Sequence, residues 1–209
     1  MTPLITLIFS SPVQFFLILL SLILSVGIHE FCHVYAAYLQ GDQTGKLMGR
    51  LTLNPLAHIE PMGLIAMLVA GIGWGKPAPF NPHALRFRRW GSFLVAMAGP
   101  ISNILLMTIF GWIGQIALKS LPETNVMVMF CLTMAYLNAG LAIFNLFPIP
   151  PLDGSRILSG ILGPHHPLVV TLERAGFFIL IIALVLFNGA ILQLVQGGAY
   201  LLMRIVGLG

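Results

Sequence analysis

Charged residues are scarce in this sequence and make up only 8% of its 209 positions. Soluble domains carry roughly 25% charged residues, so an ordinary soluble domain is excluded. Cysteine is scarce as well. Cys32 and Cys131 both lie in apolar runs, which excludes a disulfide framework and favours small buried side chains. Internal repeats and long polar linkers are missing too, so we expect one domain over residues 1–209.

Apolar residues, by contrast, reach 58% and gather in long runs. A membrane-spanning helix needs about 20 mostly apolar residues. Runs of that length lie at residues 13–39, 90–118, 126–147 and 168–187. A shorter run at 190–206 contains Gln193 and Gln196, which leaves open whether it spans fully. The pattern predicts an all-α polytopic membrane protein with about four to five transmembrane helices.

The region between the first two runs has a different pattern. Residues 61–74 form an apolar run that is too short to span, so we expect a re-entrant or buried short helix there. The stretch G-K-P-A-P-F-N-P at 75–82 follows, and its three prolines exclude a helix. This stretch should form an extended membrane-associated loop or a β-hairpin.

The basic residues indicate how the chain crosses the membrane. If residues 61–74 do not cross, nine of the ten Lys and Arg residues fall on one side, and only Lys119 falls on the other. Cytoplasmic loops carry an excess of Lys and Arg, so we expect the N-terminus outside and the basic loops in the cytoplasm. The formal net charge of +4 is then a topology signal, and no nucleic-acid partner is expected.

Three ionisable residues interrupt the first apolar run, in G-I-H-E-F-C-H at 27–33. His29 and His33 are four residues apart, so on a helix they share one face and can bind one Zn²⁺. Glu30 lies on the same turn, as in the H-E-x-x-H pattern in which the glutamate is the general base. The alternative is two histidines packed against neighbouring helices. Because a charged residue inside a span costs about 2.5 kcal/mol or more, the metal site is favoured.

A catalytic zinc site usually has three protein ligands, so a third ligand should lie at the same depth. Of the other acidic residues, Asp153 fits best. It lies in N-L-F-P-I-P-P-L-D-G at 145–154, after a run that ends on the cytoplasmic side, and His29 and His33 lie in the cytoplasmic half of their run. The prolines stop the helix, and broken backbone at this depth is tolerated where protein or water satisfies it. The role of Glu60 stays open.

Together these motifs resemble the site-2 protease family of intramembrane zinc metalloproteases, peptidase family M50. Further stretches match in the family's order: G-R-L-T-L-N-P-L-A-H-I-E-P-M-G at 49–63, G-W-G-K-P-A-P-F-N-P at 73–82 and A-G-P-I-S-N at 98–103. The resemblance covers residues 27–158, whereas the helices expected at 168–206 rest on hydropathy alone. Neither a PDZ nor a CBS domain fits in 209 residues, so the chain resembles a minimal prokaryotic-type member.

The resemblance implies roles for six residues. His29, His33 and Asp153 would bind one Zn²⁺ ion, and Glu30 would be the catalytic residue. Asn103 and Asn145 match family asparagines that contact substrate or the transition state, although Asn103 could instead join two helices and Asn145 could cap one.

The resemblance also implies the substrates and the location. The substrates would be transmembrane proteins or peptides, cut in regulated intramembrane proteolysis. The stretch 75–82 could hold them by strand addition, or it could be a plain surface loop. The protein would lie in the lipid bilayer of a prokaryotic inner or plasma membrane, with its active site toward the cytoplasm.

Two other functions are compatible with the same residues. A metal-binding membrane transporter could use them as a transit site, but it should show internal pseudo-repeats, and the sequence has none. A catalytically inactive homologue could bind membrane proteins, but the intact set of His29, Glu30, His33 and Asp153 argues against it.

Overall fold

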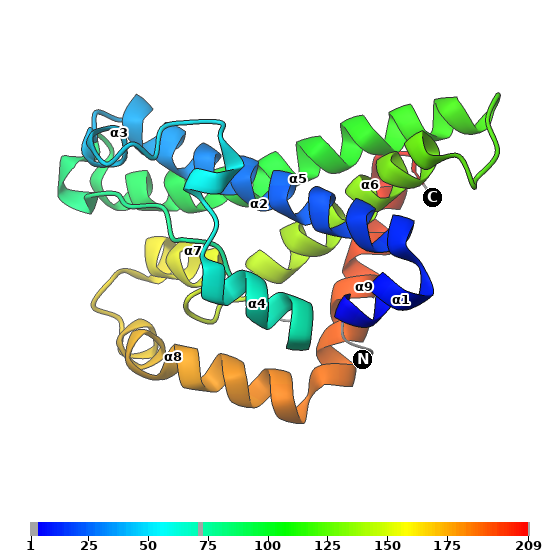
Figure 1. Ribbon diagram of the computed structural model, residues 1–209. Helices are drawn as coiled ribbons and strands as arrows, with labels where there is room; N and C mark the ends of the chain where they lie inside the picture. Colours follow the sequence, from blue (N-terminus) through cyan, green and yellow to red (C-terminus); the bar gives the residue numbers. More distant parts are fainter. Residues whose placement is uncertain (1–3, 71–72, 209) are drawn as a thin grey trace.

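The computed structural model describes residues 4–70 and 73–208, which form helices joined by short loops (Figure 1). Within these described residues, four helices are long and apolar enough to span a membrane. They are α2 (Pro12–Leu39), α5 (Arg88–Leu118), α6 (Val126–Asn145) and α8 (Pro167–Leu186). Each begins and ends within two residues of an apolar run in the sequence, so the all-α polytopic fold is confirmed. The shortest helices are η1 (Leu4–Thr6), α1 (Leu7–Ser10), α3 (Thr44–Leu47), η2 (Pro55–Ala57) and η3 (Pro82–Ala84).

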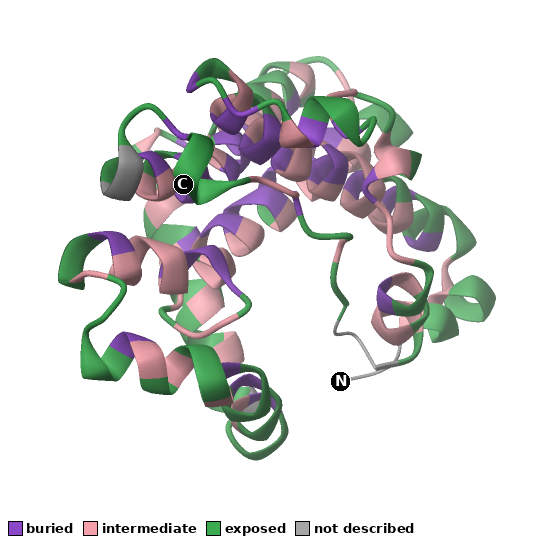
Figure 2. Cartoon of the chain, turned by 90° about the vertical axis from the view of Figure 1, so that its left-hand side faces the viewer, coloured by how far each residue is buried: buried purple, intermediate pink, exposed green. Residues whose placement is uncertain are grey.

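The packed centre of the protein consists of α2, α5 and α6. α5 and α6 form a hairpin, and α2 packs against both (Figure 1). Small side chains such as Ala96, Ala135 and Ala139 are fully buried between these helices, and small residues let helix backbones approach closely. Figure 2 shows the buried segments gathered on these helices, while the helices at the lower edge are mostly exposed.

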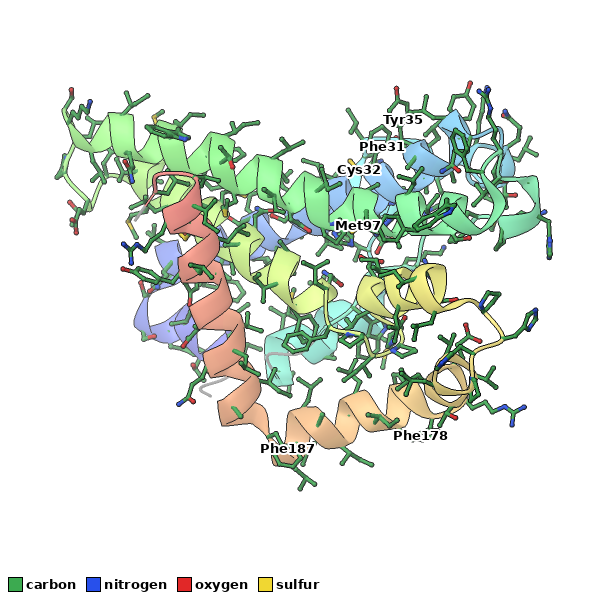
Figure 3. All side chains as sticks on the ribbon, turned by 180° about the vertical axis from the view of Figure 1, so that it is seen from behind. Phe31, Cys32, Tyr35, Met97, Phe178 and Phe187 are labelled. Atoms are coloured by element: carbon green, nitrogen blue, oxygen red, sulfur yellow. The ribbon has the colours of Figure 1, made fainter. Side chains whose placement is uncertain are left out.

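α8 runs apart from this centre. It contacts α7 (Asp153–Leu162) and α9 (Asn188–Ile205), and α4 (Pro61–Ala70) lies between it and α2 (Figure 1). Phe178 on α8 and Phe187 at the bend into α9 point outward and are 68% and 60% exposed (Figure 3). Exposed aromatic rings of this kind suit contact with lipid.

α9 returns from this bend to the packed centre. Its Ala199 packs with Met107 of α5 and Ala139 of α6 in one buried cluster. Although α9 has 18 residues, it is not among the four apolar spans found in the described part of the chain. The uncertain run at 190–206 is therefore a helix with one buried face.

α4 and the segment after it match the expected short helix and extended loop. α4 has ten residues, about half of what a span needs. The following segment is extended from residue 73 on, and among the described residues its β-bridge to the loop before α4 is the one between Ile59 and Gly75. Arg50 holds this pairing, since its Nη2 donates to the Lys76 carbonyl at 2.6 Å. Within the described residues the loop form is thus confirmed, and the hairpin alternative is reduced to one antiparallel bridge.

Candidate metal centre

His29 and His33 lie on one face of α2, one helical turn apart. Both side chains are buried, and their Nε2 atoms are 3.0 Å apart. The opposite ring nitrogens are hydrogen-bonded to α5. His29 Nδ1 lies 2.6 Å from Asn103 Oδ1, and His33 Nδ1 lies 2.7 Å from the Val95 carbonyl oxygen. The two rings are therefore fixed in orientation by a neighbouring helix.

Asp153 reaches the same place from the start of α7. The proline-rich loop after α6 turns the chain back, and Gly154 then packs against the backbone carbonyls of Leu146 and Phe147, where any Cβ would clash. Asp153 Oδ2 lies 3.1 Å from His29 Nε2 and 3.2 Å from His33 Nε2. The three residues grouped by sequence reasoning thus come together as one buried cluster, whose potential ligand atoms lie within 4.8 Å of one another.

The geometry of this cluster fits a tetrahedral zinc ion. The Val95 carbonyl can only accept a hydrogen bond, so the proton of a neutral His33 ring is on Nδ1 and its Nε2 carries a lone pair. Ligand atoms about 2.0–2.1 Å from a tetrahedral Zn²⁺ lie about 3.3 Å from one another. The three observed separations of 3.0, 3.1 and 3.2 Å are close to that value. Three acceptor atoms this close repel one another, and a cation between them removes the repulsion.

The pKa of Asp153 agrees with a ligand role. Without a metal, burial raises the pKa of this carboxyl, but the imidazoles of His29 and His33, when they carry a proton on Nε2, lower it by more, so it lies below its ordinary value. The carboxyl is therefore ionised at neutral pH, as metal ligation requires.

Gly99 of α5 covers the cluster from one side. A Cβ at this position would lie 2.6 Å from His29 Nε2 and closer still to His33 Nε2. Pro100 follows, and because it has no N–H, the Ala96 carbonyl lacks its usual helical donor in this turn. Because Gly99 has no side chain, the backbone of α5 can approach the ligand atoms of His29 and His33 closely.

Glu30 lies beside the cluster on a cavity of about 360 Å³. Its Oε2 atom is buried, and no described residue donates a hydrogen bond to it. The cavity is lined by His29, His33 and Asp153, by apolar residues of α4 and α8, and by Gly75, Pro77 and Ala78 of the extended segment. Glu60 lines it too. The unpartnered carboxylate oxygen can accept a proton from a molecule in this cavity.

The two asparagines predicted to contact substrate lie in different surroundings. Asn145 lines the cavity, and its Nδ2 donates to the Leu141 carbonyl at 3.0 Å. Asn103 is fully buried behind His29, with its amide oxygen on the His29 ring and its amide nitrogen on Asn138. Its position favours orientation of His29 over contact with substrate.

Sequence reasoning missed Gly99 and Asn138. Asn138 lies in the middle of α6, is fully buried and holds Asn103. A polar residue inside a predicted span was the available signal, because such residues usually face a bundle interior. Cys32 stands outside the cluster: Figure 3 shows it with Phe31 and Tyr35 along the side of α2 that faces away from α7 and α8.

Comparison with known proteins identifies relatives of this chain. The family model described as peptidase family M50 matches residues 110–187. A Bacillus subtilis protein with the provisional name zinc metalloprotease YwhC is 37% identical over 178 residues, which cover 80% of each chain. A Mycolicibacterium smegmatis protein provisionally named zinc metalloprotease Rip2 is 30% identical over 178 residues, covering 82% of this chain and 67% of the relative. No solved structure matches.

Proposed function

This chain belongs to peptidase family M50, the site-2 protease family of zinc metalloproteases, and from that premise we propose that it hydrolyses peptide bonds of transmembrane substrates within the membrane. The observation that carries the proposal is the buried triangle of His29, His33 and Asp153 beside the unpartnered carboxylate oxygen of Glu30. The cavity next to this triangle lies among membrane-spanning helices.

His29, His33 and Asp153 are assigned to one Zn²⁺ ion. Bound there, the ion would supply a Lewis acid that lowers the pKa of a water molecule and polarises a substrate carbonyl. The chain's part is to present two imidazole nitrogens and one carboxylate oxygen from a buried, rigid position. α5 provides that rigidity through Asn103 and Val95.

Glu30 is assigned to proton transfer. Its Oε2 takes a proton from the water whose oxygen attacks the carbonyl carbon, and later donates that proton to the leaving amine nitrogen as the C–N bond breaks. Burial without a hydrogen-bond donor leaves this oxygen available for the proton. Asn145, which lines the same cavity, is assigned to contact with substrate or transition state.

The substrates assigned to this cavity are apolar transmembrane segments. The lining from α4 and α8 is apolar, which suits the side chains of such a segment. A spanning helix pairs all its backbone groups, so it must unwind before hydrolysis. We assign to the extended segment on the cavity wall the pairing with an unwound substrate strand, which its position beside the cavity supports. We assign the protein to a prokaryotic inner or plasma membrane, with the metal centre toward the cytoplasm and the N-terminus outside.

The test is cleavage of a co-expressed model transmembrane substrate. Glu30→Gln should abolish cleavage and keep zinc, because the amide cannot take a proton but leaves the three ligands in place. Asp153→Ala should lose both zinc and cleavage. Glu173→Gln on α8 makes the same chemical change at an exposed site outside the cavity and should behave as wild type. Cleavage at the wild-type rate by Glu30→Gln would overturn the proposal.

A further inference from the structure

We propose that Asn138 is a positioning residue for the metal ligand His29, and that it acts through Asn103 to select the ring tautomer that binds metal. The inference rests on the metal centre of the proposed function. It assigns a task to a buried chain of polar groups that connects α6, α5 and α2 at the centre of the protein.

The chain of groups begins at a backbone carbonyl. Asn138 Nδ2 donates to the Met134 carbonyl oxygen at 2.8 Å. Asn138 Oδ1 accepts from Asn103 Nδ2 at 2.8 Å, and Asn103 Oδ1 lies 2.6 Å from His29 Nδ1. Asn103 and Asn138 are both 0% exposed, so water does not compete for these bonds.

Each hydrogen bond in this series of polar groups determines the orientation of the next group. A carbonyl oxygen only accepts, so the Met134 carbonyl requires the NH₂ group of Asn138 to face it. The Asn138 amide oxygen must then face Asn103, which requires the NH₂ group of Asn103 to face Asn138. The Asn103 amide oxygen is left facing His29, and it can only accept. His29 Nδ1 therefore carries the ring proton, and Nε2 is left with the lone pair that a metal needs.

Without Asn138, the orientation of Asn103 is no longer decided. An amide can rotate to present either its oxygen or its nitrogen, and both fit the same space. A rotated Asn103 would donate to His29 Nδ1 and move the ring proton to Nε2, where it blocks the metal. The tautomer of His33 does not depend on Asn138 or Asn103, because His33 Nδ1 faces the Val95 carbonyl directly.

A structural role for Asn138 alone predicts different behaviour. Asn138 Nδ2 also donates to Ser25 Oγ at 2.7 Å, so the residue joins α6 to α2 and contributes to helix packing. Loss of packing would weaken zinc binding by the same factor whatever residue occupies position 103. If Asn138 instead orients Asn103, its loss weakens zinc binding only while position 103 holds an amide, which can rotate and turn its nitrogen toward His29.

The experiment measures the zinc dissociation constant of the full chain in detergent, by competition with a chelator. Asn138→Leu, which has similar volume and no hydrogen bonds, should weaken zinc binding about tenfold, the lower end for loss of an outer partner of a metal ligand. Asn103→Asp keeps an acceptor on His29 Nδ1 in either orientation, since both carboxylate oxygens accept, and its own zinc constant is the reference for this background. Adding Asn138→Leu to Asn103→Asp should then change the constant by less than about threefold.

A second variant at position 103 and a control variant at another buried polar residue complete the experiment. If Asn103→Asp does not fold, Asn103→Ala replaces it, and Asn138→Leu should cause no further loss there. Ser21→Ala removes a hydroxyl that is also 0% exposed, one turn before Ser25, and that has no hydrogen-bond partner among the described residues. This control should keep wild-type affinity. The visible spectrum of bound Co²⁺ should change in Asn138→Leu and not in Ser21→Ala, because it reports ligand geometry.

The outcomes separate this inference from the proposed function. An unchanged zinc constant in Asn138→Leu, the same loss in every background, or an equal loss in Ser21→Ala overturns the positioning role. Wild-type protein that binds zinc in an Asp153-dependent way would still support the metal centre in those cases. Wild-type protein that binds no zinc overturns both.

Discussion

Replacement of Gly99 by alanine should remove the metal and leave the fold intact. The added Cβ would lie 2.6 Å from His29 Nε2, so this nitrogen must retreat by about 0.8 Å to reach an ordinary contact of 3.4 Å. The ring cannot retreat freely, because its Nδ1 is hydrogen-bonded to Asn103. Metal sites accept distance errors of about 0.2 Å. We therefore expect zinc affinity to fall by about 100-fold or more, beyond the usual cost of losing an outer partner.

The helix itself should tolerate this change. Alanine is about 1 kcal/mol more favourable than glycine inside a helix, so any local cost arises at the ligand atoms. Gly140→Ala in α6 is the matched control, since its Cβ would meet Val195 Cγ1 at an ordinary 3.7 Å. Zinc affinity by chelator competition and the thermal unfolding midpoint should be measured for both variants. Gly99→Ala protein that binds zinc as tightly as wild type would refute the geometry on which the metal centre is built.

Three further predictions concern the cavity and the loops. Asn145→Ala should lower kcat for a model substrate by about 100-fold and leave the zinc content unchanged, because we expect the Asn145 amide to donate to the developing oxyanion. An unchanged kcat would assign Asn145 to helix capping. Gly154→Ala should weaken zinc binding, because a Cβ there meets the Leu146 carbonyl and displaces Asp153. A zinc titration measures this, and an affinity equal to that of wild type would contradict it. Burial raises the pKa of Asp42, but hydrogen bonds from Thr44 and Asn81 lower it by more, to below its ordinary 3.8. Its ionised form thus stabilises the fold above pH 3.8, and this contribution is lost as the pH falls through the lower folded-state pKa. Wild type should therefore lose more thermal stability between pH 5 and pH 3 than Asp42→Asn, and equal losses would contradict this assignment.

Much of the fold follows from one-dimensional patterns. A span requires about 20 apolar residues whatever surrounds it, so the ends of α2, α5, α6 and α8 could be predicted closely. The ten-residue α4 was recognisable for the same reason, since it is too short. α9 was less certain, because its glutamines and glycines lower its hydropathy, and only packing of Ala199 against α5 and α6 shows where it lies.

The metal centre, too, could be predicted from the sequence only in part. The four-residue spacing of His29 and His33 places both on one face of a helix in any fold, so the sequence by itself determined this pair and made Glu30 its neighbour. The scarcity of intramembrane acids then pointed to Asp153. Only the tertiary structure decided that Gly99 covers the ligand atoms and that Asn138 orients Asn103 behind His29. Those relations join residues of three different helices, and their distances depend on how the helices pack, which no spacing along one helix contains.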